Sequence, residues 1–257
     1  MATARRVTVP LDAYVLHRYD WSETSLILDL FTRSKGRVTV AAKGAKRPYS
    51  QLRSVLLPFQ RIAATVGRQA EDAQADVVTL RSAEWAGLDA TPVLPPARLF
   101  AGFYLNELLM KLLARHDPHG ALFDAYAATV AALCAADEAR TQAALRAFEI
   151  VLLKEIGLLP DLATETASRR AVVAERRYLV LADAGVVETD AEREATTSGA
   201  TLVALQAALA ADDLPALQRT AAGALAELRP LLRAQLHYHL GTSQLRTRQV
   251  MIEAQAL

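Results

Sequence analysis

The sequence predicts an α+β protein in which a five-stranded OB-fold barrel precedes an all-α domain with a small non-helical insert. Up to about residue 85, apolar residues occur in short runs rich in Val, Ile, Leu and Thr, separated by turn residues. After Pro92, Pro95 and Pro96 the apolar period lengthens to about 3.6 residues. At 257 residues the chain is near the size at which proteins divide into two domains. The expected domains are residues 1–86 and 87–257, the second interrupted at about 161–195.

Five runs in the first domain have the pattern of strands. In the third run, Val38 and Val40 alternate with Arg37 and Thr39, which places the valines inside and Arg37 on the outer face. Five short strands with turns at this spacing favour a small closed barrel of the OB type, whose exposed strand face and loops often bind single strands. The expected strands are residues 7–19, 24–32, 37–42, 56–66 and 76–83.

The second domain has helical periodicity on both sides of its insert. Three helices are expected, from Leu99 to about 115, at 121–135 and at 137–156. In the insert, apolar residues at 172–181 followed by a turn at 184–185 indicate a hairpin. Helices resume after Ser198 and Asp213, both suitable N-caps, and the last helix ends at Gly241.

A basic segment on the second hairpin and the loop after it is the strongest functional signal. Between residues 33 and 53 there is no acidic residue, and two glycines lie among the cations. The hairpin turn and the loop at 43–49 should gather these charges on one small surface, for which a polyanion is the natural partner. The candidate DNA-binding cations are Arg33, Lys35, Arg37, Lys43, Lys46, Arg47 and Arg53.

The net charge of the whole chain conceals this segment. The total is +1, but residues 1–61 hold 11 Lys and Arg against 4 Asp and Glu, a net charge of +7, and the remainder holds 18 against 24, a net charge of −6. Such asymmetry points to polyanion contact at one end of a chain. A solvated basic face without a ligand is the alternative.

Aromatic residues in the same domain add to the polyanion argument, because aromatic faces beside cations suit unstacked bases. Phe31 and Phe59 lie in apolar runs and are expected in the core. Trp21 and Tyr49 lie in polar turns, so we include both as candidate DNA-binding residues.

Enzyme and metal motifs are not recognisable. His116 and His119 flank a helix-breaking proline without a third ligand, and Lys43-Gly44 lacks the rest of a phosphate-binding loop. One cysteine, Cys134, excludes an intrachain disulfide. We therefore expect no catalytic residue and no metal. With no signal core or membrane-length apolar run, we expect a cytoplasmic protein.

Several motifs together resemble the bacterial RecO family of recombinational repair proteins. No single match is decisive, but their order and spacing are. They are Tyr14-Val15-Leu16-His17, Trp21-Ser22-Glu23-Thr24-Ser25-Leu26-Ile27-Leu28, Phe31-Thr32, Gly36-Arg37, Ala42-Lys43-Gly44-Ala45, Leu80-Arg81-Ser82-Ala83-Glu84, Tyr104-Leu105-Asn106-Glu107-Leu108-Leu109, Leu145-Arg146-Ala147-Phe148-Glu149 and Leu245-Arg246-Thr247-Arg248.

The resemblance implies a recombination mediator without catalytic turnover. Proteins of this family bind single- and double-stranded DNA, anneal complementary strands, and work with RecR to load RecA onto DNA coated by single-strand binding protein, SSB. They also capture the acidic, Phe-ending tail of SSB on the helical domain. Arg146, in the matching helical motif, is the candidate for the terminal carboxylate, with Lys111 as a second candidate. A surface ion pair of Arg146 with Glu149 or Glu155 is the alternative.

The chain departs from the family pattern at one position. Many members carry four cysteines of a small zinc site after a turn like the one at 157–160, whereas residues 161–195 contain neither Cys nor His. We therefore expect a zinc-free insert and no cofactor. Two other functions stay open: an RNA- or translation-associated OB protein, and an adaptor that does not bind DNA.

Overall fold

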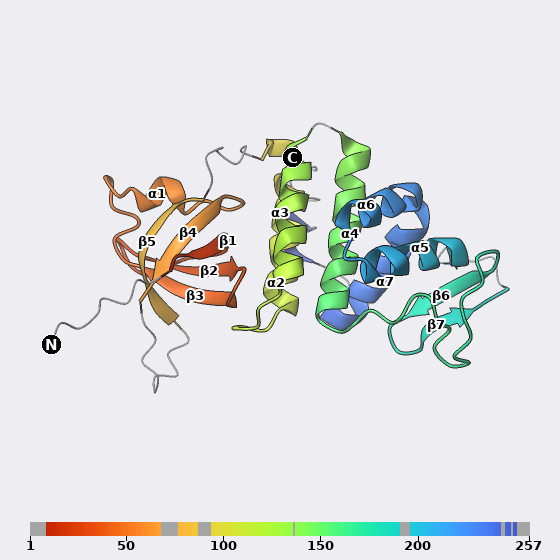
Figure 1. The fold of residues 1–257 in the computed structure, drawn as a ribbon. Helices are drawn as coiled ribbons and strands as arrows, with labels where there is room; N and C mark the ends of the chain where they lie inside the picture. The colour runs from red at the N-terminus through yellow and green to blue at the C-terminus, as the bar shows by residue number, and fades with distance from the viewer. Residues whose placement is uncertain are drawn as a thin grey trace. The chain divides into compact units, whose positions relative to one another are not determined.

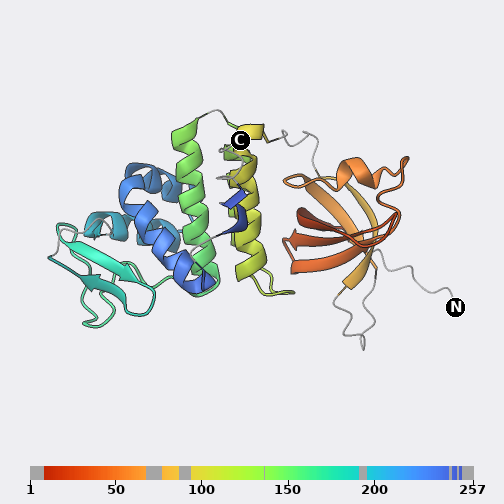
Figure 2. The ribbon, with the colours of Figure 1, turned by 180° about the vertical axis from the view of Figure 1, so that it is seen from behind.

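The computed structural model describes residues 9–67, 77–86, 94–135, 137–190, 196–242, 245–247 and 249–250. The chain forms two compact units (Figures 1 and 2). The first contains Met1–Pro96 and Leu105–Phe123, and the second contains Ala97–Tyr104 and Asp124–Leu257. The expected boundary at residue 86 divides the chain into two continuous parts. In the structure the units are discontinuous, because residues 105–123 belong to the unit of the barrel.

The first unit contains the expected five-stranded closed barrel (Figure 1). Its strand order is β1-β2-β3-β5-β4, in which only the β3–β5 pair is parallel. The fourth strand begins later than predicted, because a short helix, α1 (Leu52–Val55), and a left-handed residue, Phe59 with φ of 66°, precede it. Residues 7, 8 and 76 of the predicted strands lie outside the described residues. The strands are β1 (Leu11–Asp20), β2 (Leu26–Thr32), β3 (Gly36–Ala42), β4 (Arg61–Val66) and β5 (Val77–Trp85).

Alternate residues of the strands fill the inside of the barrel. Val38 and Val40 are buried there as predicted, beside Val15, Leu28 and Leu30. The period of two is the physical reason, because side chains of a strand alternate between its faces. Their burial supplies the hydrophobic free energy that closes the barrel.

The outer face of β1, β2 and β3 is also partly buried. Tyr14 and Phe31 point to this face, and both rings lie 5.4 Å from the ring of Phe123. Nearby, the side-chain amide of Asn106 donates a hydrogen bond of 2.9 Å to the carbonyl of Leu16. The expectation of an exposed strand face is therefore wrong around Tyr14 and Phe31, because these outward side chains are themselves large and apolar and are covered by residues of the same unit.

The helices occur where the sequence predicts them. The side chain of Asp137 accepts hydrogen bonds from the amides of Ala139 and Arg140, and Ser198 and Asp213 cap the next two helices. The final helical stretch is divided at Ala224, which the sequence analysis treated as continuous. The helices are α2 (Leu99–Leu112), α3 (Gly120–Cys134), α4 (Glu138–Glu155), α5 (Gly199–Ala210), α6 (Leu214–Gly223) and α7 (Leu225–Leu240).

The insert contains the predicted hairpin, and a short strand that directly follows the insert pairs with it. Strands β6 (Arg177–Leu181) and β7 (Gly185–Glu188) pair antiparallel, and β8 (Thr197–Ser198) pairs with the other edge of β6. Gly185 has a φ of 72°, which suits the turn residue predicted there. Gln235 of α7 donates a hydrogen bond of 2.8 Å to the Val180 carbonyl, so the insert is anchored to the helices by polar contacts.

Within the described ranges, no helix is long and apolar enough to cross a membrane. The same ranges contain no group of three or more His, Cys, Asp or Glu side chains that is arranged to hold a metal ion.

Candidate nucleic-acid interface and peptide pocket

The basic segment is divided between the two ends of the β2–β3 hairpin. Arg33 and Lys35 lie in the turn between the strands, where the Arg33 amide donates to the Asp12 carbonyl at 3.0 Å. Lys43 follows β3 at the opposite end. Because a strand rises about 3.3 Å per residue, the two ends are about 20 Å apart. The prediction of one small surface is therefore wrong, since β3 itself separates the charges.

The end of the barrel at Lys43 surrounds a cavity of about 480 Å³, which we call the barrel-mouth cavity. The Lys46 ammonium group donates to Asp20 at 3.0 Å and to the Ser22 carbonyl at 2.9 Å, so this lysine is engaged. The side chains of Lys43, Arg47 and Arg53 are exposed. The cavity is lined by Arg18, Asp20, Leu26, Ala45, Lys46, Leu52, Arg53 and Leu56, three cations against one acid.

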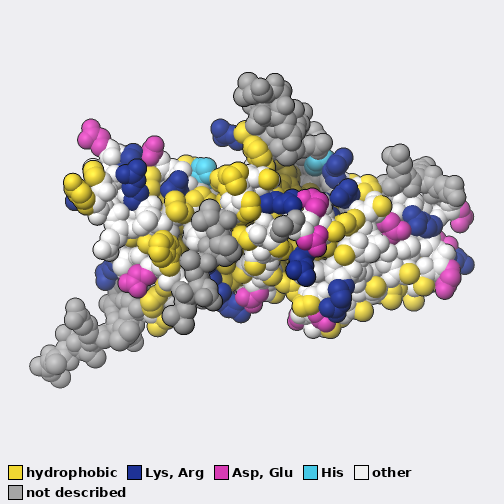
Figure 3. Space-filling model, turned by 90° about the horizontal axis from the view of Figure 1, so that it is seen from above, with side chains coloured by type: hydrophobic (Ala, Val, Ile, Leu, Met, Phe, Trp, Pro, Cys, Tyr) yellow, Lys and Arg dark blue, Asp and Glu magenta, His cyan; other side chains and the backbone are white. Residues whose placement is uncertain are grey.

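Lys and Arg side chains lie next to exposed apolar ones on the surface built by the barrel (Figure 3). Such a mixture offers cations to phosphates and apolar faces to bases. Trp21 and Tyr49 are 56% and 99% exposed, whereas Phe31 and Phe59 are buried, as the sequence predicts.

Arg37 differs from the other predicted DNA-binding cations. Its guanidinium group donates to the carbonyl of Met110, and the amide of His116 donates to the Arg37 carbonyl at 3.0 Å. Its Nε atom is buried without a hydrogen-bond partner among the described residues. Arg37 thus joins β3 to the segment that covers the sheet, and contact with a phosphate would require the loss of these bonds.

Two aromatic residues of β1 were missed by the sequence analysis. Tyr19 is 43% exposed and His17 is also exposed, and their ring centroids are 4.4 Å apart. Burial and the neighbouring Asp29 carboxylate raise the pKa of the Tyr19 hydroxyl above its ordinary value. Arg18, between them, was missed as well, because the strand pattern gave no reason to separate it from its neighbours.

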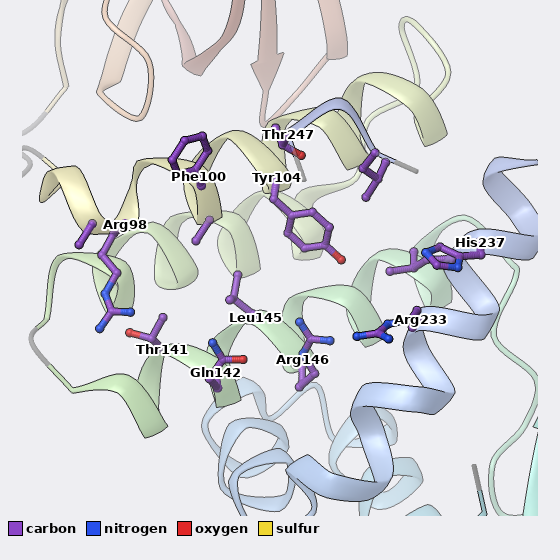
Figure 4. Close-up of a pocket in the computed structure, with 14 residues that line it drawn as sticks. Arg98, Phe100, Tyr104, Thr141, Gln142, Leu145, Arg146, Arg233, His237 and Thr247 are labelled. Atoms are coloured by element: carbon purple, nitrogen blue, oxygen red, sulfur yellow. The ribbon is translucent and has the colours of Figure 1, made fainter. Parts of the chain in front are cut away.

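The second unit contains a pocket of about 520 Å³, here called the helical pocket (Figure 4). Figure 4 shows the guanidinium groups of Arg146 on α4 and Arg233 on α7 directed toward the same hollow. Apolar side chains, including Phe100, Leu145 and Leu236, form other parts of the lining. The pocket therefore combines an apolar surface with positive charge.

Arg146 is held by a buried carboxylate. One of its terminal nitrogens lies 2.8 Å from Glu149 Oε1, and the Tyr104 hydroxyl donates to the same oxygen at 2.7 Å. Glu149 is fully buried, and this burial raises the pKa of its carboxyl despite the attraction of Arg146. The Arg146–Glu149 ion pair, the alternative to a ligand site, is present, and of its two members Arg146 lines the pocket. Lys111 instead pairs with Glu107 at 3.2 Å and does not line this pocket.

Comparison with known proteins agrees with this architecture. The family model described as "Recombination protein O N terminal" matches residues 7–87, and the one described as "Recombination protein O C terminal" matches residues 96–249.

The chain belongs to the RecO family. It is 49% identical to the "DNA repair protein RecO" of Polaromonas naphthalenivorans strain CJ2, with both chains covered over their whole length. It is 49% identical to the protein of the same name from Variovorax paradoxus strain S110 and 48% identical to that of Polaromonas sp. strain JS666, again with full coverage of both chains. The RecO resemblance in the sequence is therefore confirmed.

Proposed function

We propose that this DNA repair protein of the RecO family is a recombination mediator that binds single- and double-stranded DNA and anneals complementary strands. Exposed cations around the barrel-mouth cavity are the observation that carries the proposal. Lys43, Arg47 and Arg53 would contact phosphates there, and Arg33 and Lys35 would form a second contact at the other end of the hairpin. Annealing requires the repulsion between two phosphate backbones to be screened, and basic side chains provide that screening without chemistry.

Complementary labelled oligonucleotides test this proposal. The wild type is expected to speed their annealing at low salt, and the Arg33→Ala, Lys35→Ala double variant is expected to anneal more slowly while it retains most of its affinity for one strand. Higher affinity for folded RNA than for DNA would favour the RNA-associated alternative. No detectable affinity for either nucleic acid would favour the adaptor.

We propose that the helical pocket takes the SSB tail. An acidic peptide ending in Phe needs an apolar recess for the ring and cations for the terminal carboxylate. Phe100, Leu145 and Leu236 are suited to the ring, and Arg146 and Arg233 are suited to the carboxylate. Because Lys111 pairs with Glu107 outside the lining, we assign it no direct contact.

Titration of a labelled SSB-tail peptide against variants tests this assignment. Arg233→Ala is the cleaner variant, because Arg233 is exposed and the Arg146–Glu149 pair stays intact. We expect it to lower the affinity for the peptide about tenfold, the loss typical of one charge-assisted hydrogen bond. Lys111→Ala is the matched control and should leave the affinity for the peptide unchanged. Equal affinity of the peptide with and without its terminal Phe would contradict the proposed pocket.

We further propose, from family membership, that the chain cooperates with RecR in loading RecA onto SSB-coated DNA. A direct test adds purified RecR and measures the lag before RecA filaments form on such DNA. The lag should shorten only when both proteins are present.

A further inference from the structure

A bulge in β1 determines which side chains the end of that strand presents. Val15 pairs with Leu30, but His17 pairs with Asp29, so Leu16 is the extra residue. Residues paired across two strands share a face. His17 therefore lies on the outer face with Asp29, and Tyr19, opposite Ile27, lies on the same face.

The same bulge sends Arg18 the other way. Arg18 pairs with Leu28, which points into the barrel, and its guanidinium group donates to the Leu56 carbonyl at 3.3 Å. There it lines the barrel-mouth cavity with Lys46 and Arg53. Without the bulge, His17 and Tyr19 would share the face of Val15, and Arg18 would point outward. The bulge thus sorts aromatic rings to one side of the strand and a cation to the other.

These aromatic residues are exposed. The rings of His17 and Tyr19 meet edge to face at 4.4 Å, and Trp21, two residues further along, is 56% exposed. An aromatic surface beside a cationic cavity has the composition that binds unpaired nucleotides, with stacking for bases and charge for phosphates.

We propose that His17, Tyr19 and Trp21 form a stacking platform for unpaired bases, while Arg18 and Arg53 at the barrel-mouth cavity bind the adjoining phosphates. This inference rests on the proposed DNA binding and adds the form of DNA that the site selects, namely a strand with unpaired bases. Bases in a duplex are stacked on each other, so the platform favours single strands.

The two tryptophans of the chain allow a direct test. Trp85 pairs with Ile62, which is opposite Ala13, so it lies at the end of the barrel away from Trp21. A Trp85→Phe chain reports on Trp21 alone, and a Trp21→Phe chain is the matched control. Each is titrated with oligo(dT) and with an abasic oligonucleotide of equal length, which carries the same phosphates without bases.

We expect oligo(dT) to quench the fluorescence of the Trp85→Phe chain and to leave the Trp21→Phe chain unchanged. Affinity for oligo(dT) should exceed that for the abasic strand about five- to twentyfold, in keeping with stacking on a few exposed rings. Tyr19→Ala should lower this ratio without changing abasic affinity, and Tyr19→Phe should preserve it.

Three results would overturn the platform. They are equal affinity of the wild type for the two strands, quenching confined to Trp85, and an equal loss for both strands in Tyr19→Ala. If the wild type binds neither strand at low salt, the underlying proposal of DNA binding fails instead.

Discussion

Replacing Lys43, Arg47 and Arg53 together with alanine should weaken single-strand binding and make it less dependent on salt. All three side chains are exposed, so their loss should change the stability of the fold by no more than about 0.5 kcal/mol each. Lys46 is left in place because it is bonded to Asp20 and Ser22, and its removal would disturb the loop itself.

The expected magnitude follows from the number of phosphates released. Each phosphate neutralised on a single strand contributes about 0.7 to the slope of log affinity against log salt, so three lost contacts lower the slope by about 2. Between 50 and 200 mM salt, this difference means that the wild type loses about 20 times more affinity than the variant.

Fluorescence anisotropy of a labelled oligonucleotide over that salt range measures the slope. The control replaces three exposed arginines of the helical unit, Arg140, Arg219 and Arg229, and so changes the net charge equally. If both triple variants lower the slope by the same amount, only the overall charge matters. The argument for a barrel-mouth site would then be refuted.

Four further predictions concern stability and metal content. Phe123→Ala should lower the free energy of unfolding by about 3–5 kcal/mol in urea denaturation, because it leaves Tyr14 and Phe31 uncovered; an unchanged midpoint would contradict the covered face. Burial raises the pKa of Glu149, so between the ordinary Glu pKa and the raised pKa the folded state binds more protons than the unfolded state. The stability of the wild type therefore falls as pH rises over this range. Glu149→Gln lacks this titration, so its stability relative to the wild type should rise over the same range in thermal melts. Burial favours a higher pKa for Glu227, but hydrogen bonds from Ser198 and from Arg177 outweigh burial, and the pKa in the folded state is lowered. The stabilisation by the Glu227 carboxylate is therefore present above the ordinary Glu pKa and is lost as pH falls through the lowered pKa of the folded state. Glu227→Gln should make the loss of stability at acidic pH less steep. The insert should unfold at the same temperature with and without EDTA, and stoichiometric zinc in metal analysis of the untagged protein would overturn this prediction.

The local signals of the sequence predicted the strands and helices well, because caps and turns act through neighbouring residues. Ser198 and Asp213 cap helices, and Gly185 and Gly241 adopt left-handed conformations, the first where the hairpin turn enters β7 and the second after the end of α7. The end of α6 at Ala224 was missed, although Gly223 immediately before it is the type of residue that often ends a helix.

Features that depend on tertiary contacts were not predictable in the same way. The Arg37 side chain points outward, as its alternation with Val38 predicts. The outer face of the sheet is nevertheless covered there by residues 105–123, which are distant in sequence. The bulge at Leu16 shifts the alternation of β1, so Arg18 and Tyr19 lie on faces opposite to those given by simple counting. Arg233 is distant in sequence from Arg146, and only the packing of α7 against α4 brings both to one pocket.

The covered outer face of the sheet also explains where the barrel presents its charges. Tyr14, Phe31 and Arg37 occupy that face with contacts to the barrel's own unit, so the middle of the hairpin has no exposed wall to offer a ligand. The exposed cations of the basic segment accordingly lie at the two ends of the β2–β3 hairpin, in turns and loops except for Arg53, which is in α1. Loops tolerate such clusters because each charge keeps its water, whereas the same charges on a buried face would require partners. For this chain, the search for a nucleic-acid contact therefore moves from the middle of the strand face to the hairpin ends, and in particular to the barrel mouth, where the exposed rings at the end of β1 flank Arg18 of the cavity in sequence.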